Sequence, residues 1–154
     1  MLDRHLVFTV HNGQKYVRLK SVDRLTDQET HVAGVFDGKT LKVFINGKPT
    51  GMTSFSGRYR RSRLTFMIGA NPEDRKPPIN LFSGVIDEVR VSSTVRYDNE
   101  FTPSVRFASD EFTLALYHFD EGSGEIVNDS SGNGFHGKVA GAKWIKTVGV
   151  DGIE

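Results

Sequence analysis

Short apolar runs separated by turn residues recur along the chain. Residues 6–10 and 16–20 are the first two runs, and Asn12 and Gly13 lie between them. An Asn-Gly pair accepts the positive φ angles of a tight turn, so these runs are predicted to form a β-hairpin. No useful stretch has helical periodicity. The many short strands with turn signals therefore predict an all-β protein, a two-layer antiparallel β-sandwich of the jelly-roll type.

A second hairpin is predicted over residues 30–47. Asp-Gly at positions 37–38 is expected at the centre of a type I′ turn, and Asn-Gly at positions 46–47 supplies the same chemistry after the second strand. Apolar and polar positions alternate along that second strand, as expected for a sheet with one solvated face. Phe44 breaks the alternation and is expected to point outward.

Later segments carry weaker signals. Strands are predicted over residues 64–69 and 85–91, and the three prolines within residues 71–80 predict an exposed loop because proline cannot donate to a β-ladder. Residues 114–119 are apolar on both faces, which predicts a central strand. The last strands are expected within residues 134–145.

Length and composition favour one domain without a strongly charged partner. A chain of 154 residues with 37% hydrophobic content encloses one core, so a single sandwich is predicted over residues 1–146 and a flexible tail over residues 147–154. The net charge of +1 gives no overall attraction to nucleic acid or an anionic membrane. No apolar run reaches the about 20 residues that span a bilayer, and no signal peptide is expected. The absence of cysteine excludes disulfides and leaves the compartment open.

Four short motifs stand out along the chain. They are His31-Val32-Ala33, Phe36-Asp37-Gly38, Ile45-Asn46-Gly47 and Phe82-x-Gly84-x-Ile86-Asp87-Glu88-Val89-Arg90. These motifs resemble those of the laminin-G-like jelly roll, one of the concanavalin A-like sandwiches, although Glu29 stands where the family usually has tryptophan. The resemblance implies the jelly-roll fold and a non-catalytic module that recognises carbohydrate or a protein partner. It also implies a larger protein that is secreted, periplasmic or on the cell surface.

The order of the motifs departs from the family. Residues 116–137 resemble the opening of such a domain, yet they lie near the end of this chain. Either the terminal strands complete one sandwich in permuted order, which we favour, or the chain joins the end of one module to the beginning of another. An open sheet edge would then invite another chain, so a homodimer or an interdomain dock is the alternative function.

Candidate ligand-binding residues concentrate in one basic loop. Arg58, Tyr59, Arg60 and Arg61, followed by Arg63, suit phosphate, a sulfated glycan or single-stranded nucleic acid, although surface charge clusters often bind nothing specific. The balanced overall charge argues against nucleic acid as the partner. Two aromatic residues elsewhere are considered for stacking on a sugar. Tyr97 is a weak loop candidate, and Trp144 is expected to pack in the core instead.

Calcium is the only cofactor considered. Asp120, Glu121, Asp129 and Asn133 supply oxygen atoms in Gly- and Ser-rich segments of the kind that calcium accepts. Their spacing matches no fixed calcium loop. The alternative, which we favour, is that these side chains stabilise turns through the neighbouring backbone.

No catalytic residue is predicted. Concanavalin A-like glycan hydrolases use a Glu-x-Asp-x-x-Glu strand that aims three carboxylates into one cleft, and this spacing is absent here. Asp87 shares a predicted strand face with three valines, so it is expected to be buried and satisfied by hydrogen bonds or a cation. His31 and His118 are expected to pack within strands.

Overall fold

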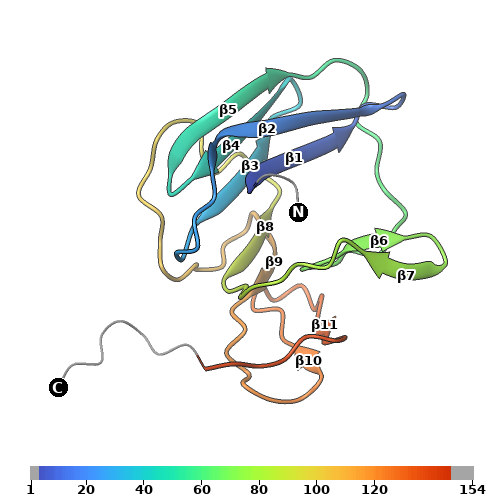
Figure 1. Ribbon diagram of the computed structural model, residues 1–154, viewed down its shortest axis with the longest axis vertical. Helices are drawn as coiled ribbons and strands as arrows, with labels where there is room; N and C mark the ends of the chain where they lie inside the picture. The colour runs from blue at the N-terminus through green and yellow to red at the C-terminus, as the bar shows by residue number, and fades with distance from the viewer. Residues whose placement is uncertain (1–3, 147–154) are drawn as a thin grey trace. The chain divides into compact units, whose positions relative to one another are not determined.

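The structure is a computed structural model that describes residues 4–146 (Figure 1). Its secondary structure in that range consists of β-strands, without a helix and hence without a helix able to cross a membrane. The chain divides into two compact units. The first comprises Met1–Gly84 and Thr94–Ser104, and the second comprises Val85–Ser93 and Val105–Glu154. The predicted tail, residues 147–154, lies outside the described residues.

The first unit is built from two antiparallel layers. A hairpin of β1 and β2 lies over a three-stranded sheet in the order β3-β4-β5 (Figure 1). A further short hairpin pairs β6 with β7. The prediction of an antiparallel all-β fold is confirmed. The strands of this unit are β1 His5–His11, β2 Tyr16–Arg24, β3 Val32–Phe36, β4 Thr40–Ile45, β5 Lys48–Ser54, β6 Asn71–Glu73 and β7 Lys76–Ile79.

The two layers enclose an apolar core. Leu41 and Val43, both 0% exposed on β4, pack with Leu19 of β2. On β3, Gly34 leaves room for the ring of Phe8, because a Cβ atom at Gly34 would lie 2.8 Å from the ring carbon Cδ2. The alternation of apolar residues along β4 therefore reflects the packing of this inner face, as predicted.

The outer face of the β3-β4-β5 sheet is covered as well. Phe44 is 0% exposed because the rings of Tyr97 and Phe101 lie over it, with centroid distances of 6.3 and 5.6 Å. Tyr97 and Phe101 stack on each other at 3.6 Å. Phe44 does lie on the outer face of the sheet, as expected, but it is not available to another chain, because a segment more than fifty positions later packs against it.

In the two large hairpins the glycine is the first central residue of the turn, whereas a type I′ turn at Asp37-Gly38 would make the glycine the second. Gly13 (φ 94°) and Gly38 (φ 92°) have positive φ, whereas Asn12 and Asp37 do not. In each turn the Asn or Asp side chain accepts two backbone N–H groups of the following residues. Positive φ at the first central position alone is typical of a type II′ turn. The hairpins are confirmed, and the type I′ assignment at Asp37-Gly38 is wrong.

The second unit contains two short sheets. Strand β8, Val89–Ser92, pairs antiparallel with β9, Thr113–Tyr117, and β10, Ile126–Val127, pairs with β11, Gly137–Lys138. The strand predicted over residues 85–91 forms only from Val89 onward. Glu88 has a φ of 50°, which interrupts the extended backbone immediately before β8.

Two predictions for residues 64–80 are also corrected. Residues 64–69 do not form a strand, and residues 71–80 contain the β6-β7 hairpin instead of a loop. The exposure predicted for the prolines is confirmed at Pro77 and Pro78. A two-stranded hairpin consists of edge strands, where a residue without an N–H group is tolerated.

Candidate functional site

The basic loop is bound to the tip of the β1-β2 hairpin. The backbone N–H of Arg58 donates to the carbonyl oxygen of Asn12 at 3.2 Å, and that of Arg60 donates to the carbonyl oxygen of His11, also at 3.2 Å. The Asn12 side chain adds a third link, because its Nδ2 donates to the Ser56 carbonyl oxygen at 2.9 Å. These three hydrogen bonds hold residues 56–60 at a defined position beside the turn of the β1-β2 hairpin.

Asn12 is suited to this role because all its polar groups are used. Its Oδ1 accepts the N–H groups of Gln14 and Lys15, at 3.1 and 2.9 Å, within the turn. Its side chain is buried, and a Cβ atom at Gly57 would lie 2.7 Å from its carbonyl oxygen. Only glycine allows the loop to approach so closely, since Gly57 also has a φ of 110°.

Two open hollows flank this junction. In the second, the side chains of Tyr16 and Tyr59 are 62% and 58% exposed, and the His11 ring meets the Tyr16 ring edge-to-face at 4.9 Å. Exposed aromatic rings beside arginines combine a flat apolar surface with donors, which suits a sugar ring bearing acidic or hydroxyl groups. One hollow is lined by Asn12, Gly13, Gln14, Lys15, Ser56, Gly57 and Arg58, and the second by Thr9, Val10, His11, Tyr16, Tyr59, Arg60, Arg61 and Ser62.

The structure thus gathers four of the five predicted ligand-binding residues, Arg58 to Arg61, but not Tyr97. Tyr59 lies beside Phe36 at one end of β3, whereas Tyr97 meets His31 just before the other end. Four residues of extended strand separate these ends by about 13 Å. Sequence reasoning missed the hairpin-tip residues, because nothing local signals that a turn 45 positions earlier lies next to the arginines.

The other aromatic candidate, Trp144, is partly buried in the second unit. Its indole Nε1–H donates to the carbonyl oxygen of Gly124 at 2.8 Å. A hydrogen-bonded, half-covered indole is better explained by packing than by an open stacking platform.

The residues predicted to hold calcium form hydrogen bonds within the second unit. Asp129 is the most heavily used: its carboxylate accepts the N–H groups of Leu116, Ser131 and Phe135 at 2.9–3.0 Å, and the Ser131 hydroxyl at 2.8 Å. Burial raises the pKa of Asp129, but these hydrogen bonds outweigh that effect and hold the pKa at about 2. The Asn133 Nδ2 donates to the carbonyl oxygens of Thr113 and Leu114.

The two remaining candidates have separate partners. Asp120 accepts a hydrogen bond from Arg106 Nη2 at 2.7 Å, which lowers the pKa of this carboxyl group. Glu121 accepts two hydrogen bonds from Asn128 through Oε1, while its Oε2 is a buried atom without a hydrogen-bond partner. Across residues 4–146, no three His, Cys, Asp or Glu side chains converge on a point that a metal ion could occupy.

Calcium is accordingly expected to have little effect. A cation needs about six to eight oxygen ligands, and most of the candidate oxygens already accept protein hydrogen bonds. We expect the melting temperature of chelator-treated protein to change by less than about 1 °C in millimolar calcium, because only binding to the folded state raises it. A rise of several degrees in a thermal scan would show instead that the acidic loop rearranges around the ion.

A carboxylate that the sequence did not single out lies immediately before β8. Glu88 Oε1 accepts the His118 Nδ1–H at 2.6 Å, and Oε2 accepts the backbone N–H of Phe107 at 2.9 Å. The side chains of Glu88 and His118 are 12% and 16% exposed. Asp87, which was predicted to be buried, is exposed, because the positive φ at Glu88 breaks the alternation of the expected strand. Glu88 ties residue 107 and the end of β9 to β8.

Comparisons with known proteins agree with this architecture. Residues 2–102 match a laminin-G family model described as the concanavalin A-like lectin/glucanases superfamily. Searches of the curated proteins and of the solved structures found no match. The match covers about two thirds of the chain, including all strands from β1 to β8. With its two antiparallel layers and this match, the chain belongs to the concanavalin A-like lectin/glucanase superfamily.

Proposed function

We propose that this protein is a non-catalytic recognition module that binds carbohydrate at the tip of the β1-β2 hairpin. The observation that carries the proposal is the second hollow, in which two exposed tyrosines lie beside Arg60 and Arg61. Sugar rings stack on exposed aromatic faces while arginine and histidine donate hydrogen bonds to their oxygens. Membership of a superfamily of lectins and glucanases supports carbohydrate as the ligand class.

The missing glucanase motif supports a binding role. The sequence lacks the Glu-x-Asp-x-x-Glu pattern with which the related glycan hydrolases aim three carboxylates into one cleft. Glycan hydrolysis requires a pair of carboxylates on either side of the scissile bond. Reducing-sugar release from common polysaccharides would contradict this part of the proposal. We place the module in a larger extracytoplasmic protein, as is common for laminin-G-like domains.

Glycan binding is expected to depend on the tyrosines of the second hollow. Replacing Tyr16 or Tyr59 by alanine should weaken binding of a ligand found on a glycan array about tenfold, since an aromatic contact contributes about 1–1.5 kcal/mol. Calorimetric titration of that ligand measures the loss. Tyr97→Phe is the control, because it removes only a hydroxyl group from a ring stacked on Phe101, outside the hollow. Equal affinities for all three variants and the parent protein would exclude this site.

Assembly is a second candidate, supported by one observation. Within residues 64–82 of the first unit, large apolar side chains are solvent-exposed. Exposed apolar stretches of this kind favour association. A monomer in sedimentation at high protein concentration would argue against self-association. The residues concerned are Leu64, Phe66, Met67, Ile79, Leu81 and Phe82.

A further inference from the structure

The nearly neutral net charge conceals a strong separation of charge along the chain. Residues 1–72 contain 12 Lys and Arg against 5 Asp and Glu, whereas residues 73–154 contain 8 against 14. Two stretches, residues 4–22 and 38–72, contain no acidic residue at all. A separation of this kind creates a local positive potential that the overall charge of +1 does not reveal.

The fold brings these two acid-free stretches together. Residues 9–16 come from the first and residues 56–62 from the second, and together they line both hollows. No carboxylate therefore belongs to either lining. Among the described residues, none of the ion pairs involves Lys15, Arg58, Arg60 or Arg61. Four exposed cations crowd at one tip without a protein counter-charge, which costs repulsive energy unless a ligand supplies the anions.

The cations are divided between the two hollows. Lys15 and Arg58 line the first hollow, and Arg60 and Arg61 line the second. Arg58 and Arg60 are two residues apart on a segment bound to the end of β1, a spacing of about 7 Å in extended chain. A ligand that carries acidic groups at intervals can therefore occupy both hollows at once, and each arginine fork can bind a sulfate or carboxylate through two hydrogen bonds.

We propose that the ligand is an acidic glycan chain whose sulfate or carboxylate groups occupy both hollows, with Lys15 and Arg58 binding one group and Arg60 and Arg61 the next. This inference rests on the proposed function and specifies its ligand class. A single-stranded polynucleotide offers similar charges and stacking faces. The glycan is favoured because the superfamily match points to lectins and glucanases.

The test compares four probes by calorimetric titration: a heparin-derived hexasaccharide, a hexamer of galacturonate, neutral cellohexaose and oligo-dT. We expect one or both acidic glycans to bind at least about tenfold more tightly than cellohexaose, and the binding to weaken as salt rises, because the Debye length falls from about 10 Å at 0.1 M to about 3 Å at 1 M. Comparing the affinities of the heparin-derived hexasaccharide and the galacturonate hexamer shows whether sulfate or carboxylate groups are preferred.

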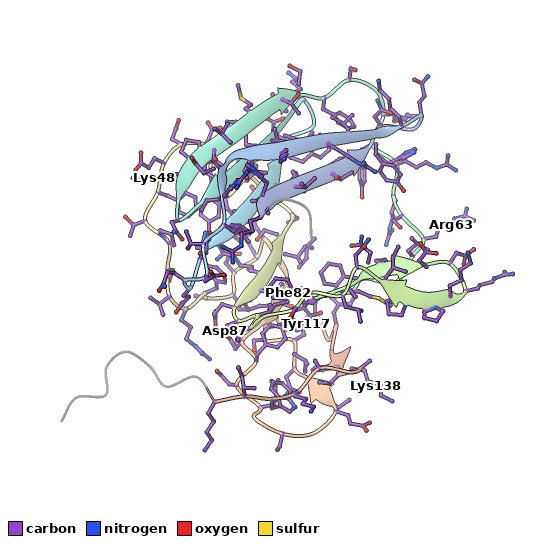
Figure 2. All side chains as sticks on the ribbon, viewed as in Figure 1. Lys48, Arg63, Phe82, Asp87, Tyr117 and Lys138 are labelled. Atoms are coloured by element: carbon purple, nitrogen blue, oxygen red, sulfur yellow. The ribbon has the colours of Figure 1, made fainter. Side chains whose placement is uncertain are left out.

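Paired variants locate the binding. We expect each of two double variants to lower the affinity for the preferred acidic glycan about tenfold: Lys15→Ala with Arg58→Ala, and Arg60→Ala with Arg61→Ala. Replacing Arg60 and Arg61 by glutamate should abolish binding, because the reversed charge repels the acidic groups. The matched control is Lys39→Ala with Lys48→Ala, which removes two exposed cations of the same unit outside the hollows. Figure 2 labels Lys48 of this control and Arg63 of the basic loop, which lie well apart in the first unit.

The outcomes separate the two proposals. Binding of cellohexaose as tight as that of the acidic probes would overturn the acidic-ligand inference and leave carbohydrate recognition standing. Failure of all three glycans would count against both, and a preference for oligo-dT would overturn the glycan as ligand. Equal losses in the hollow variants and in the lysine control would show that the charge of the unit, and not these hollows, attracts the probe. Unchanged circular-dichroism melting of each variant verifies that it folds.

Discussion

Alanine in place of Gly47 is expected to destabilise the first unit by more than about 3 kcal/mol, or to prevent it from folding. Gly47 has a φ of 77°, and its N-terminal neighbour Asn46 has a φ of 50°, so together they form the type I′ turn between β4 and β5. A Cβ atom at Gly47 would fall on the carbonyl oxygen of Phe101, inside van der Waals contact. Because that oxygen is backbone, the whole covering segment would have to move.

The consequence extends beyond the turn. The N–H of Phe101 donates to the Gly47 carbonyl oxygen at 3.1 Å, and Lys42 pairs with Asp98 on the same segment. Displacing the segment would break these contacts and expose Phe44, whose complete burial contributes about 2–3 kcal/mol. Urea unfolding followed by far-ultraviolet circular dichroism measures the loss.

Gly38→Ala provides the matched control. Gly38 also has a positive φ, 92°, but a Cβ atom there would meet no atom within 4 Å. This variant should therefore lose only the about 1–3 kcal/mol that such a positive φ costs an alanine, without the added clash. If both variants lost the same stability, the close approach of Phe101 to Gly47 would be excluded as the cause.

Alanine in place of Asp129 is expected to destabilise the second unit by about 3 kcal/mol. Three backbone N–H groups would lose their acceptor, and an unsatisfied donor costs about 1–3 kcal/mol when buried, as at Leu116. Trp144 is the only tryptophan and belongs to this unit, so its fluorescence during urea unfolding reports on the unit directly. Asp120→Ala is the control, because its exposed pair with Arg106 should contribute less than about 1 kcal/mol.

The same carboxylate predicts how stability depends on pH. Asp129 has a pKa of about 2 in the folded protein, below the ordinary 3.8 that it regains on unfolding. The unfolded state therefore takes up a proton first as the pH falls. The stabilisation is fully present above pH 4 and is lost between pH 4 and pH 2.

The parent protein and Asp129→Ala should thus converge in stability toward pH 2, as followed by Trp144 fluorescence. Asp37 also has a pKa of about 2, because the Thr40 hydroxyl and the N–H groups of Lys39 and Thr40 donate to it, but it lies in the first unit. A constant difference between parent and variant from pH 6 to pH 2 would contradict the assignment to Asp129.

Predictions from sequence succeeded where a structure depends on neighbouring residues. The four strands β1 to β4, between residues 5 and 45, and the turns of their two hairpins were recognised because glycine after Asn or Asp favours a chain reversal. The turn type at Asp37-Gly38 was missed, since it depends on the carboxylate accepting the N–H groups of Lys39 and Thr40.

Predictions failed where a distant segment decides the outcome. The pattern along β4 places Phe44 on the outer face, but it does not show that residues 94–104 cover that face. The pattern before β8 predicts that Asp87 is buried, whereas the positive φ at Glu88 leaves Asp87 exposed and turns the Glu88 carboxylate inward. The sequence offered the interpretation that Asp129 stabilises a local turn. It did not predict the hydrogen bond from the N–H of Leu116 to Asp129, because these residues are thirteen positions apart.

The chain's own sequence determined the all-β class, the hairpins and the basic loop, because turn chemistry and strand alternation act over a few residues. Only the tertiary structure decided that the loop joins the hairpin tip to form two hollows, since Arg58 and Asn12 are 46 positions apart and meet through backbone hydrogen bonds. A local pattern indicates which side chains of a segment are exposed. Whether the exposed side chains of two distant segments lie side by side depends on contacts between the segments, which no local pattern encodes.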